Sequence, residues 1–281
     1  MAIKIVTDST CDLSPEVIDK YEIEIIPLSI HVEGKSYRDG VDLTKSEFLK
    51  ILTTAKELPK SSQPSLGAFK ETYERLAASE PNVQIISIHL ANTLSGTFQT
   101  AQTAADMVDI DVTVVNSNFI SHALGYQVLE AARLANQGQS VEEIIDRLQT
   151  IRAHTSLHLM VDTLEYLAKG GRIGKGKALL GSLLKIKPIA SLANGVYTPI
   201  GKVRTYWQMI QMLTRKFEEE TKGRGIRRIS IAHIGADQLA QRLKESLQNA
   251  SEITEIPIIV TSPIISAHTG PGAVALMYYT D

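Results

Sequence analysis

The sequence predicts an α/β fold with a mainly parallel N-terminal sheet, flanking helices and a mixed α/β C-terminal part. In the first half, short β-branched runs alternate with amphipathic stretches, which is typical of βαβ units. This alternation becomes less regular near residues 157–161. The length of 281 residues corresponds to about two domains. We therefore expect one domain over residues 1–156 and a second over 157–281.

The N-terminal half divides into strands and helices in order. We expect strands at Ile3–Val6, at Ile23–Ile30 with a break at Pro27, at Val83–His89 and at Val112–Val115. Helices are expected from Pro15, at Phe48–Leu52, around Phe69 to Leu76, at Phe98–Met107 and through Leu129 and Ala132. Thr44 and Ser140 each precede a glutamate by three residues, which is the pattern of a capping box. Leu58–Ser65 is predicted to be a loop from its composition.

The C-terminal half is more varied. We expect a helical stretch at Leu179–Leu184, a hairpin turning at Asn194-Gly195, and an amphipathic helix through Trp207 and Phe217. A strand at Ile229–Ala232, a helix at Leu239–Leu247, a strand at Ile256–Val260 and an extended segment beyond Gly272 complete the chain.

Composition and charge exclude several classes of protein. The chain has 29 Lys and Arg against 31 Asp and Glu, so its net charge of −2 gives no reason to expect a nucleic-acid partner. No apolar run approaches the roughly 18 residues of a membrane span. The single cysteine, Cys11, cannot form an internal disulfide, which fits a reducing compartment. We expect a soluble, unprocessed protein of the cytoplasm.

Two motifs resemble a catalytic and a metal-binding site but lack features that such sites require. Gly171–Lys177 matches part of a phosphate-binding P-loop, but Ala178 lacks the hydroxyl that holds magnesium, and Thr163–Lys169 separates the motif from the nearest strand. His154 and His158 are spaced to share a helical face, but no cysteine joins them and the residues between resemble a helix end. We expect a basic surface turn and an ordinary histidine pair.

Two clusters of hydroxyl residues are more informative. Ser61–Ser65 forms a polar segment that enters a helix, and Ser95-Gly96-Thr97 opens a helix after a strongly apolar strand. The second cluster lies at the carboxyl edge of the expected parallel sheet, where a helix N-terminus attracts anions. Simple capping by Ser95 is the alternative, and the pattern leaves both open. A third cluster, Ser266–Gly272, combines His268 with a tight Gly-Pro-Gly turn.

Taken together, six short motifs resemble, in order, those of the DegV family. They are Thr7-Asp8-Ser9-Thr10, Ser61–Ser65, Leu94–Phe98, Lys169–Ile173, Lys202–Thr205 and His268–Gly272. The resemblance covers nearly the whole chain and implies a bacterial lipid-binding protein of two α/β domains. Such a protein holds one long-chain fatty acid in its N-terminal lipid-binding domain. A separate kinase subunit phosphorylates the carboxylate to an acyl phosphate.

The resemblance also implies which residues bind the ligand: Ser61, Ser95, Ser62, His268, Arg172 and Arg204. The first two are expected to hold the carboxylate, and Ser62 is a substitute for Ser61. The family usually has threonine at position 61, and it commonly has serine at position 174, where this chain has glycine. No cofactor or metal is implied, and the chain is expected to be a carrier rather than an enzyme. Transient contact with a membrane is compatible with this role.

Charge is distributed unevenly along the chain. Between Lys169 and Phe217 there is no acidic residue, whereas ten are basic. They are Lys169, Arg172, Lys175, Lys177, Lys185, Lys187, Lys202, Arg204, Arg215 and Lys216. We expect this segment to receive an acidic surface of the kinase, the alternative being a solvated basic face. A different function also remains open, namely action on a phosphorylated small molecule through the basic glycine-rich loop.

Overall fold

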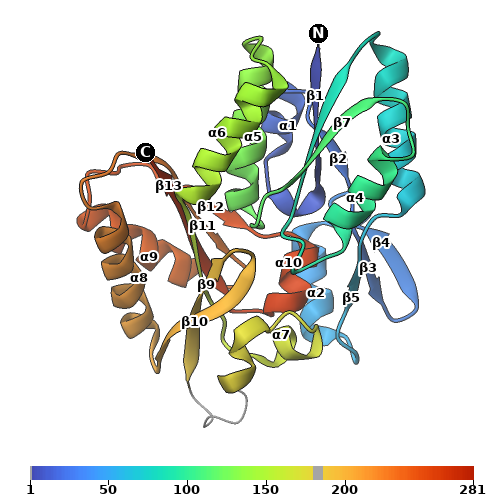
Figure 1. Cartoon of the computed structure of the whole chain (residues 1–281). Coiled ribbons are helices and arrows are strands. Elements are labelled where there is room, and N and C mark those ends of the chain that lie inside the picture. The colour runs from blue at the N-terminus through green and yellow to red at the C-terminus, as the bar shows by residue number, and fades with distance from the viewer. Residues whose placement is uncertain (1, 180–185) are drawn as a thin grey trace.

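The computed structural model describes residues 2–179 and 186–281 and stacks its elements in alternating layers of helix and sheet (Figure 1). A parallel sheet lies between two helical layers, and one of these layers separates it from a larger mixed sheet. Further helices cover the outer face of the mixed sheet. The α/β class predicted from the sequence is confirmed.

The first sheet is parallel and has the order β2-β1-β6-β7. Its strands are β1 (Ile3–Asp8), β2 (Glu24–Ile26), β6 (Gln84–His89) and β7 (Asp111–Asn116). Residues 85–89 of β6 are all buried, as expected of a central parallel strand with both faces covered. The carboxyl ends of β1 and β6 therefore open side by side at one edge of the sheet.

Helices cover both faces of the parallel sheet. Those on one side are α3 (Leu66–Ser79) and α4 (Thr97–Ala105), and those on the other are α5 (His122–Asn136) and α6 (Val141–Ala153). The capping box predicted at Ser140 is confirmed: its hydroxyl accepts from the Glu143 N–H, and the Glu143 carboxylate accepts from the Ser140 N–H. Short helices η1 (Ser9–Cys11) and α1 (Pro15–Lys20) follow β1.

The second sheet is mixed, with the order β10-β9-β8-β13-β11-β12. Its strands are β8 (Thr155–Met160), β9 (Lys187–Ala193), β10 (Val196–Val203), β11 (Ile226–His233), β12 (Ile258–Val260) and β13 (Val274–Thr280). The hairpin predicted at Asn194-Gly195 joins β9 to β10, and both turn residues have positive φ. Helices α8 (Tyr206–Thr221) and α9 (Asp237–Asn249) pack on the outer face.

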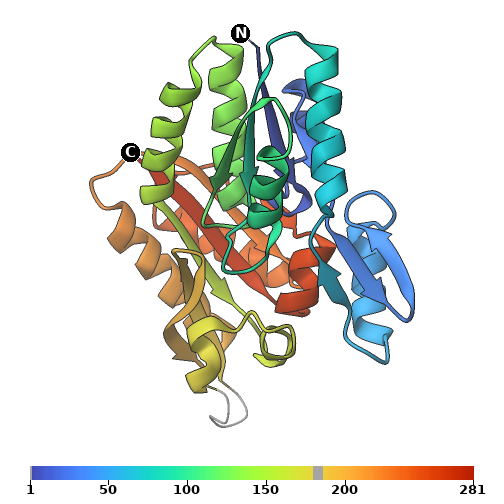
Figure 2. The same cartoon turned by 45° about the vertical axis from the view of Figure 1, so that its right-hand side comes forward.

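A small third sheet projects from the N-terminal half (Figure 2). It consists of β3 (Ser29–Val32), β4 (Lys35–Arg38) and β5 (Lys60–Ser62), with α2 (Lys45–Thr54) packed beside it. The predicted capping box at Thr44 begins α2. Apolar side chains of α2 and β3 contact α10 (Pro263–Thr269), so this sheet is anchored to the C-terminal half.

Several local predictions were wrong. Residues 23–30 form no single strand, because Pro27 divides them between β2 in the parallel sheet and β3 in the small sheet. Residues 60–62, expected in a loop, pair with β3 as β5, since pairing outweighs the weak strand propensity of Lys and Ser. By contrast, the turn predicted at Gly270-Pro271-Gly272 is confirmed, and the residues before it in the cluster are helical. The helix expected at Leu179–Leu184 falls almost entirely outside the described residues.

The expected domain boundary falls inside a strand. Residues 156 and 157 both belong to β8, and every strand of the mixed sheet lies at or after Thr155. The hydrophobic core is continuous across this point, because side chains of α5 pack against both large sheets. The division into domains at 156/157 stays a prediction.

Candidate ligand-binding site

A cavity of about 280 Å³ lies between the N-terminal and C-terminal halves. The N-terminal half contributes Leu28, Ser61, Ser62, Gln63, Leu90, Leu94, Ser95, Ile120 and Ser121. The C-terminal half contributes strand and loop residues from Leu157 to Leu192, together with parts of β10, β11, α10 and β13. Among the described lining residues none is Asp or Glu, and aliphatic side chains predominate. The cavity therefore suits an apolar ligand and offers no repulsion to an anionic end.

The structure brings five of the six predicted site residues to this cavity. Ser61, Ser62, Ser95, Arg172 and His268 all line it. They come from β5, the loop before α4, the loop after α7 (Glu165–Lys169), and α10. Segments more than two hundred residues apart in the sequence thus meet at one end of the cavity.

Arg204 does not join them. Its side chain is exposed, it is absent from the cavity lining, and its backbone N–H donates to the Gln208 Oε1 at the start of α8, 3.0 Å away. The two arginines predicted near the ligand therefore occupy different environments.

Ser61 and Ser62 point in opposite directions from β5. Ser61 pairs with the fully buried Ile30 of β3, and residues opposite one another on paired strands share a face. The Ser61 Oγ lies 2.7 Å from the His268 Nε2, whereas the Ser62 Oγ lies 2.8 Å from the Nε2 of the exposed His31. Ser61 is therefore the hydroxyl that faces the half-buried His268.

His268 is held as a neutral imidazole. Burial, and then the positive charge of Arg172, lower its pKa to about 4. Its Nδ1 is buried without a hydrogen-bond partner among the described residues. A buried N–H left without an acceptor costs about 1–3 kcal/mol, so the ring proton is best placed on Nε2, donating to Ser61. The hydroxyl hydrogen of Ser61 is then available for an acceptor in the cavity.

Arg172 connects the two halves of the chain beside this histidine. Its Nε donates to the Leu94 carbonyl at 2.9 Å and its Nη1 to the Gly170 carbonyl at 2.6 Å. A Cβ at Gly170 would collide with the His268 ring, so glycine permits the close approach of this loop. Arg172 therefore fixes the loop that carries Ser95 against the loop after α7.

Ser95 lies one residue before the N-cap of α4. The N-cap is Gly96, which makes no side-chain capping bond, but the Ser95 Oγ accepts from the Thr97 N–H at 3.3 Å and lies 2.8 Å from the Thr97 Oγ1. A Cβ on Gly96 would collide with the Gln63 side chain. Ser95 thus helps to satisfy the first turn of α4 while its side chain also borders the cavity, and anion binding at this position stays a prediction.

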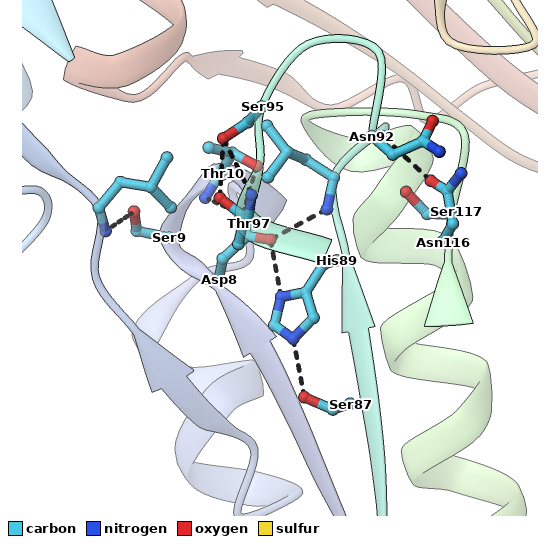
Figure 3. Close-up of polar contacts among 12 residues, drawn as sticks. Asp8, Ser9, Thr10, Ser87, His89, Asn92, Ser95, Thr97, Asn116 and Ser117 are labelled. Carbon is cyan, nitrogen blue, oxygen red and sulfur yellow. Dashed lines mark hydrogen bonds and ion pairs between the residues drawn. The ribbon is translucent and has the colours of Figure 1, made fainter. Parts of the chain in front are cut away.

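A buried relay lies behind the same sheet edge (Figure 3). Asp8 accepts from the Leu90 N–H and lies 3.0 Å from the His89 Nδ1, while the His89 Nε2 lies 2.7 Å from the Ser87 Oγ. This order of groups resembles a Ser-His-Asp triad, but all three side chains are fully buried and none lines the cavity. Its effect is structural: Asp8 fixes the residue at which the loop to Ser95 leaves β6.

Apart from Arg172, the residues of the remaining sequence motifs do not line the cavity. His154 ends α6 and His158 lies within β8, so they share no helical face. The glycine-rich segment follows helix α7 and continues into the short helix η2 (Gly174–Leu179), which is not the strand–loop–helix order of a P-loop. Among the described residues no cluster of His, Cys, Asp and Glu could hold a metal ion, and no helix has the length and apolarity that crossing a bilayer requires.

Sequence reasoning missed the apolar walls of the cavity. Leu90, Ile120, Leu157 and Leu192 line it, yet each lies in a strand or turn whose pattern also fits an ordinary core. Asp8, which belongs to the first of the six motifs, ends β1 and marks the carboxyl edge of this parallel strand.

Comparisons with known proteins agree on one family. The model of a family described as "Uncharacterised protein, DegV family" matches residues 2–281. A DegV domain-containing protein of Listeria monocytogenes is 41% identical over 280 residues, or 99% of each chain. One from Staphylococcus aureus is 41% identical over 273 residues, or 97% of each chain.

Solved structures are similar over the full chain. A DegV family protein from Thermus thermophilus, described for its fatty acid binding, superposes with a TM-score of 0.93 at 32% identity. DegV of Bacillus subtilis, described as a fatty acid binding protein, superposes with a TM-score of 0.91 at 33% identity. In both cases 100% of each chain is covered.

Proposed function

The chain belongs to the DegV family, and from that premise we propose that it binds one long-chain fatty acid in the cavity between its two halves. The related structures from Thermus thermophilus and Bacillus subtilis, both described as binding fatty acid, support this proposal. A ligand with an apolar tail and an anionic head matches the lining of the cavity.

One observation carries the proposal: in a cavity whose surface is mainly apolar, two serine hydroxyls, a guanidinium and an imidazole come together. Ser61, Ser95, Arg172 and His268 form the polar end. A carboxylate there accepts hydrogen bonds from the two serine hydroxyls, beside the guanidinium of Arg172. Ser62 is turned toward His31, which makes it the weaker candidate for contact with the head group.

The two ends of such a ligand contribute differently. Burying about fourteen methylenes at roughly 0.8 kcal/mol each is worth about 11 kcal/mol before the costs of binding. Each hydrogen bond to the charged carboxylate adds about 1.5–3 kcal/mol. The tail therefore supplies most of the affinity, and the head group fixes the orientation.

The fatty acid is presented for phosphorylation by a separate kinase subunit. A carboxylate oxygen attacks the γ-phosphorus of ATP bound by that partner, giving an acyl phosphate on this chain and ADP on the partner. This role rests on the family motifs, and it makes the present chain a carrier in the cytoplasm rather than the enzyme.

Some of the ten basic residues between Lys169 and Phe217 support a role in docking the kinase, whereas others are paired with acidic residues. Lys169 pairs with Glu165, Lys187 with Asp162 and Lys216 with Glu220, and Lys185 lies outside the described residues. The exposed members are the paired Lys169 and five others: Lys175, Lys177, Lys202, Arg204 and Arg215. Lys175 and Lys177 closely follow Arg172 in the sequence, so the surface formed by the exposed basic residues adjoins the polar end of the cavity. Because Arg204 is exposed and does not line the cavity, we assign it to this docking surface.

Charge reversal tests the docking role. Replacing Lys175 and Lys177 with glutamate should weaken association with the kinase and reduce its dependence on salt, while fatty-acid affinity stays unchanged. Lys222 and Arg224, exposed beyond the end of α8, provide a charge-matched control that should leave association intact. Equal losses in both double variants would show that only net charge matters.

Native mass spectrometry tests the binding function itself. Purified protein should carry additional mass equal to one acyl chain, and solvent extraction should recover that chain as a free fatty acid. Delipidated protein should take up palmitate or oleate in a ratio of one to one. Protein that is free of lipid and also fails to bind either acid would overturn the proposal.

A further inference from the structure

We propose that Leu157 and Leu192 form the end wall of the cavity and set the longest acyl chain that it admits. This inference rests on the proposed fatty-acid binding. It assigns a specificity role to two leucines that sequence patterns would place in an ordinary core.

Strand register separates Leu157 from the segment that carries His268. Val274, just beyond the turn that follows α10 and His268, pairs with Met160 at the end of β8. Leu157 pairs with Met277, three residues further along, which is about 10 Å at the usual strand rise. Leu157 thus lies well beyond Val274 along the strand that leads away from His268.

Leu192 stands beside Leu157 on the neighbouring strand. His158 pairs with Ser191 in the antiparallel β8–β9 ladder, so the next residues along, Leu157 and Leu192, are adjacent across the two strands. Both side chains are buried and belong to the same core cluster, together with Phe119. They form a continuous apolar surface at this end of the cavity.

A second, polar cleft begins on the far side of this surface. It has a volume of about 320 Å³, and Leu157, Ser191 and Leu192 line both it and the cavity. Its other lining residues are mostly polar: Asn118, Phe119, Arg152, Ala153, Thr155, Ser156, His158, Ala193, Asn194 and Glu220. The two leucines are therefore a thin partition between an apolar and a polar space.

The cleft contains an ionised carboxylate. The Glu220 Oε2 accepts from the Ser156 Oγ at 2.5 Å and from the Tyr278 hydroxyl at 2.7 Å, and it lies 3.3 Å from the His158 Nε2. Burial alone would raise the pKa of Glu220, but these hydrogen bonds hold it below its usual range. A methylene pushed past the leucines would meet charged and hydrated groups.

Affinity should consequently depend on chain length in two stages. Each additional methylene accommodated by the cavity tightens binding by about fourfold, because roughly 0.8 kcal/mol of transfer free energy is gained. Once the tail reaches Leu157 and Leu192, a longer chain must displace them or bend, and affinity falls. The wall therefore fixes the optimum length.

Truncation of the wall tests the assignment. Dissociation constants should be measured for saturated acids from lauric to behenic with wild type, Leu157→Ala, Leu192→Ala and the double variant. We expect the optimum to move to longer chains. The preference for the next longer acid over the acid that wild type binds best, measured as the ratio of their dissociation constants, should rise at least about tenfold in the variants. Leu159→Ala is the matched control, because Leu159 lies on the same strand and lines the cavity but not the cleft. It should weaken binding of all lengths without moving the optimum.

A substitution that enlarges a side chain of the wall provides a second test in case the truncated variants fail to fold. Leu192→Phe enlarges the wall and should shorten the optimum, and thermal melting identifies variants that fail to fold. An unchanged optimum in the folded wall variants would overturn the inference, as would an equal shift in Leu159→Ala. Failure of wild type to bind any acid would instead overturn the proposed function.

Discussion

Replacing Ser61 with alanine, and separately Ser62, distinguishes two hydroxyls that are neighbours in the sequence but face different surroundings. The Ser61 Oγ is 2.7 Å from the Nε2 of half-buried His268, and the Ser62 Oγ is 2.8 Å from the Nε2 of exposed His31. Both changes remove the same atom from the same strand. Differences in ligand binding between them therefore report position rather than chemistry.

The size of the expected effect follows from the hydrogen bond that is lost. A hydrogen bond to a charged carboxylate is worth about 1.5–3 kcal/mol, which corresponds to about 10- to 150-fold in affinity. In Ser61→Ala the His268 Nε2–H is released and can donate to the carboxylate directly. We therefore expect the low end of this range, about tenfold. Ser62→Ala should change affinity by less than about twofold, as most surface substitutions do.

Isothermal titration of delipidated protein with myristate, palmitate and stearate measures the loss of affinity in Ser61→Ala and in Ser62→Ala. The loss in Ser61→Ala should be the same for every acid, because the contribution of each methylene arises in a different part of the cavity. An equal or larger loss in Ser62→Ala would refute this assignment of the head-group site. A loss that grows with chain length would refute the separation of head from tail.

Further predictions concern charge and pH. Replacing Arg172 with methionine should raise the pKa of His268 from about 4 without restoring its ordinary value, because burial is the larger cause; an unchanged pKa in an NMR titration would contradict this. Burial also raises the pKa of Asp39 from 3.8 to about 7, so the folded form retains a proton that the unfolded form loses. The contribution of Asp39 to stability should therefore fall as the pH rises from about 4 to about 7, by up to about 4 kcal/mol, whereas His122, His233 and His268, whose pKa values are lowered, contribute the opposite dependence. Denaturant unfolding should accordingly show stability rising more steeply with pH in Asp39→Asn than in wild type. The same pH dependence in the variant and in wild type would assign the proton to another group.

Local signals in the sequence predicted much of the framework correctly. The capping boxes at Thr44 and Ser140 and the hairpin at Asn194-Gly195 each depend on residues a few positions apart, and all three are confirmed. Ser95 could be placed at the edge of the parallel sheet because it follows directly on a buried strand. These predictions needed no knowledge of distant contacts.

Features that depend on distant pairing could not be predicted. Polar residues 60–62 become a strand only through their pairing with β3, about thirty residues earlier in the chain, and that pairing also turns Ser61 inward and Ser62 outward. Leu157 and Leu192 resemble core residues in any pattern, since an internal cavity and a filled core require the same aliphatic side chains. The buried relay at Asp8 depends on a contact between β1 and β6.

A crystal structure of the protein loaded with palmitate tests the central claim most directly. The account predicts elongated density in the cavity, with the carboxylate within hydrogen-bond distance of the Ser61 and Ser95 hydroxyls and the tail directed toward Leu157 and Leu192. A cavity that holds only water, or a palmitate whose carboxylate lies away from both serines, would contradict it.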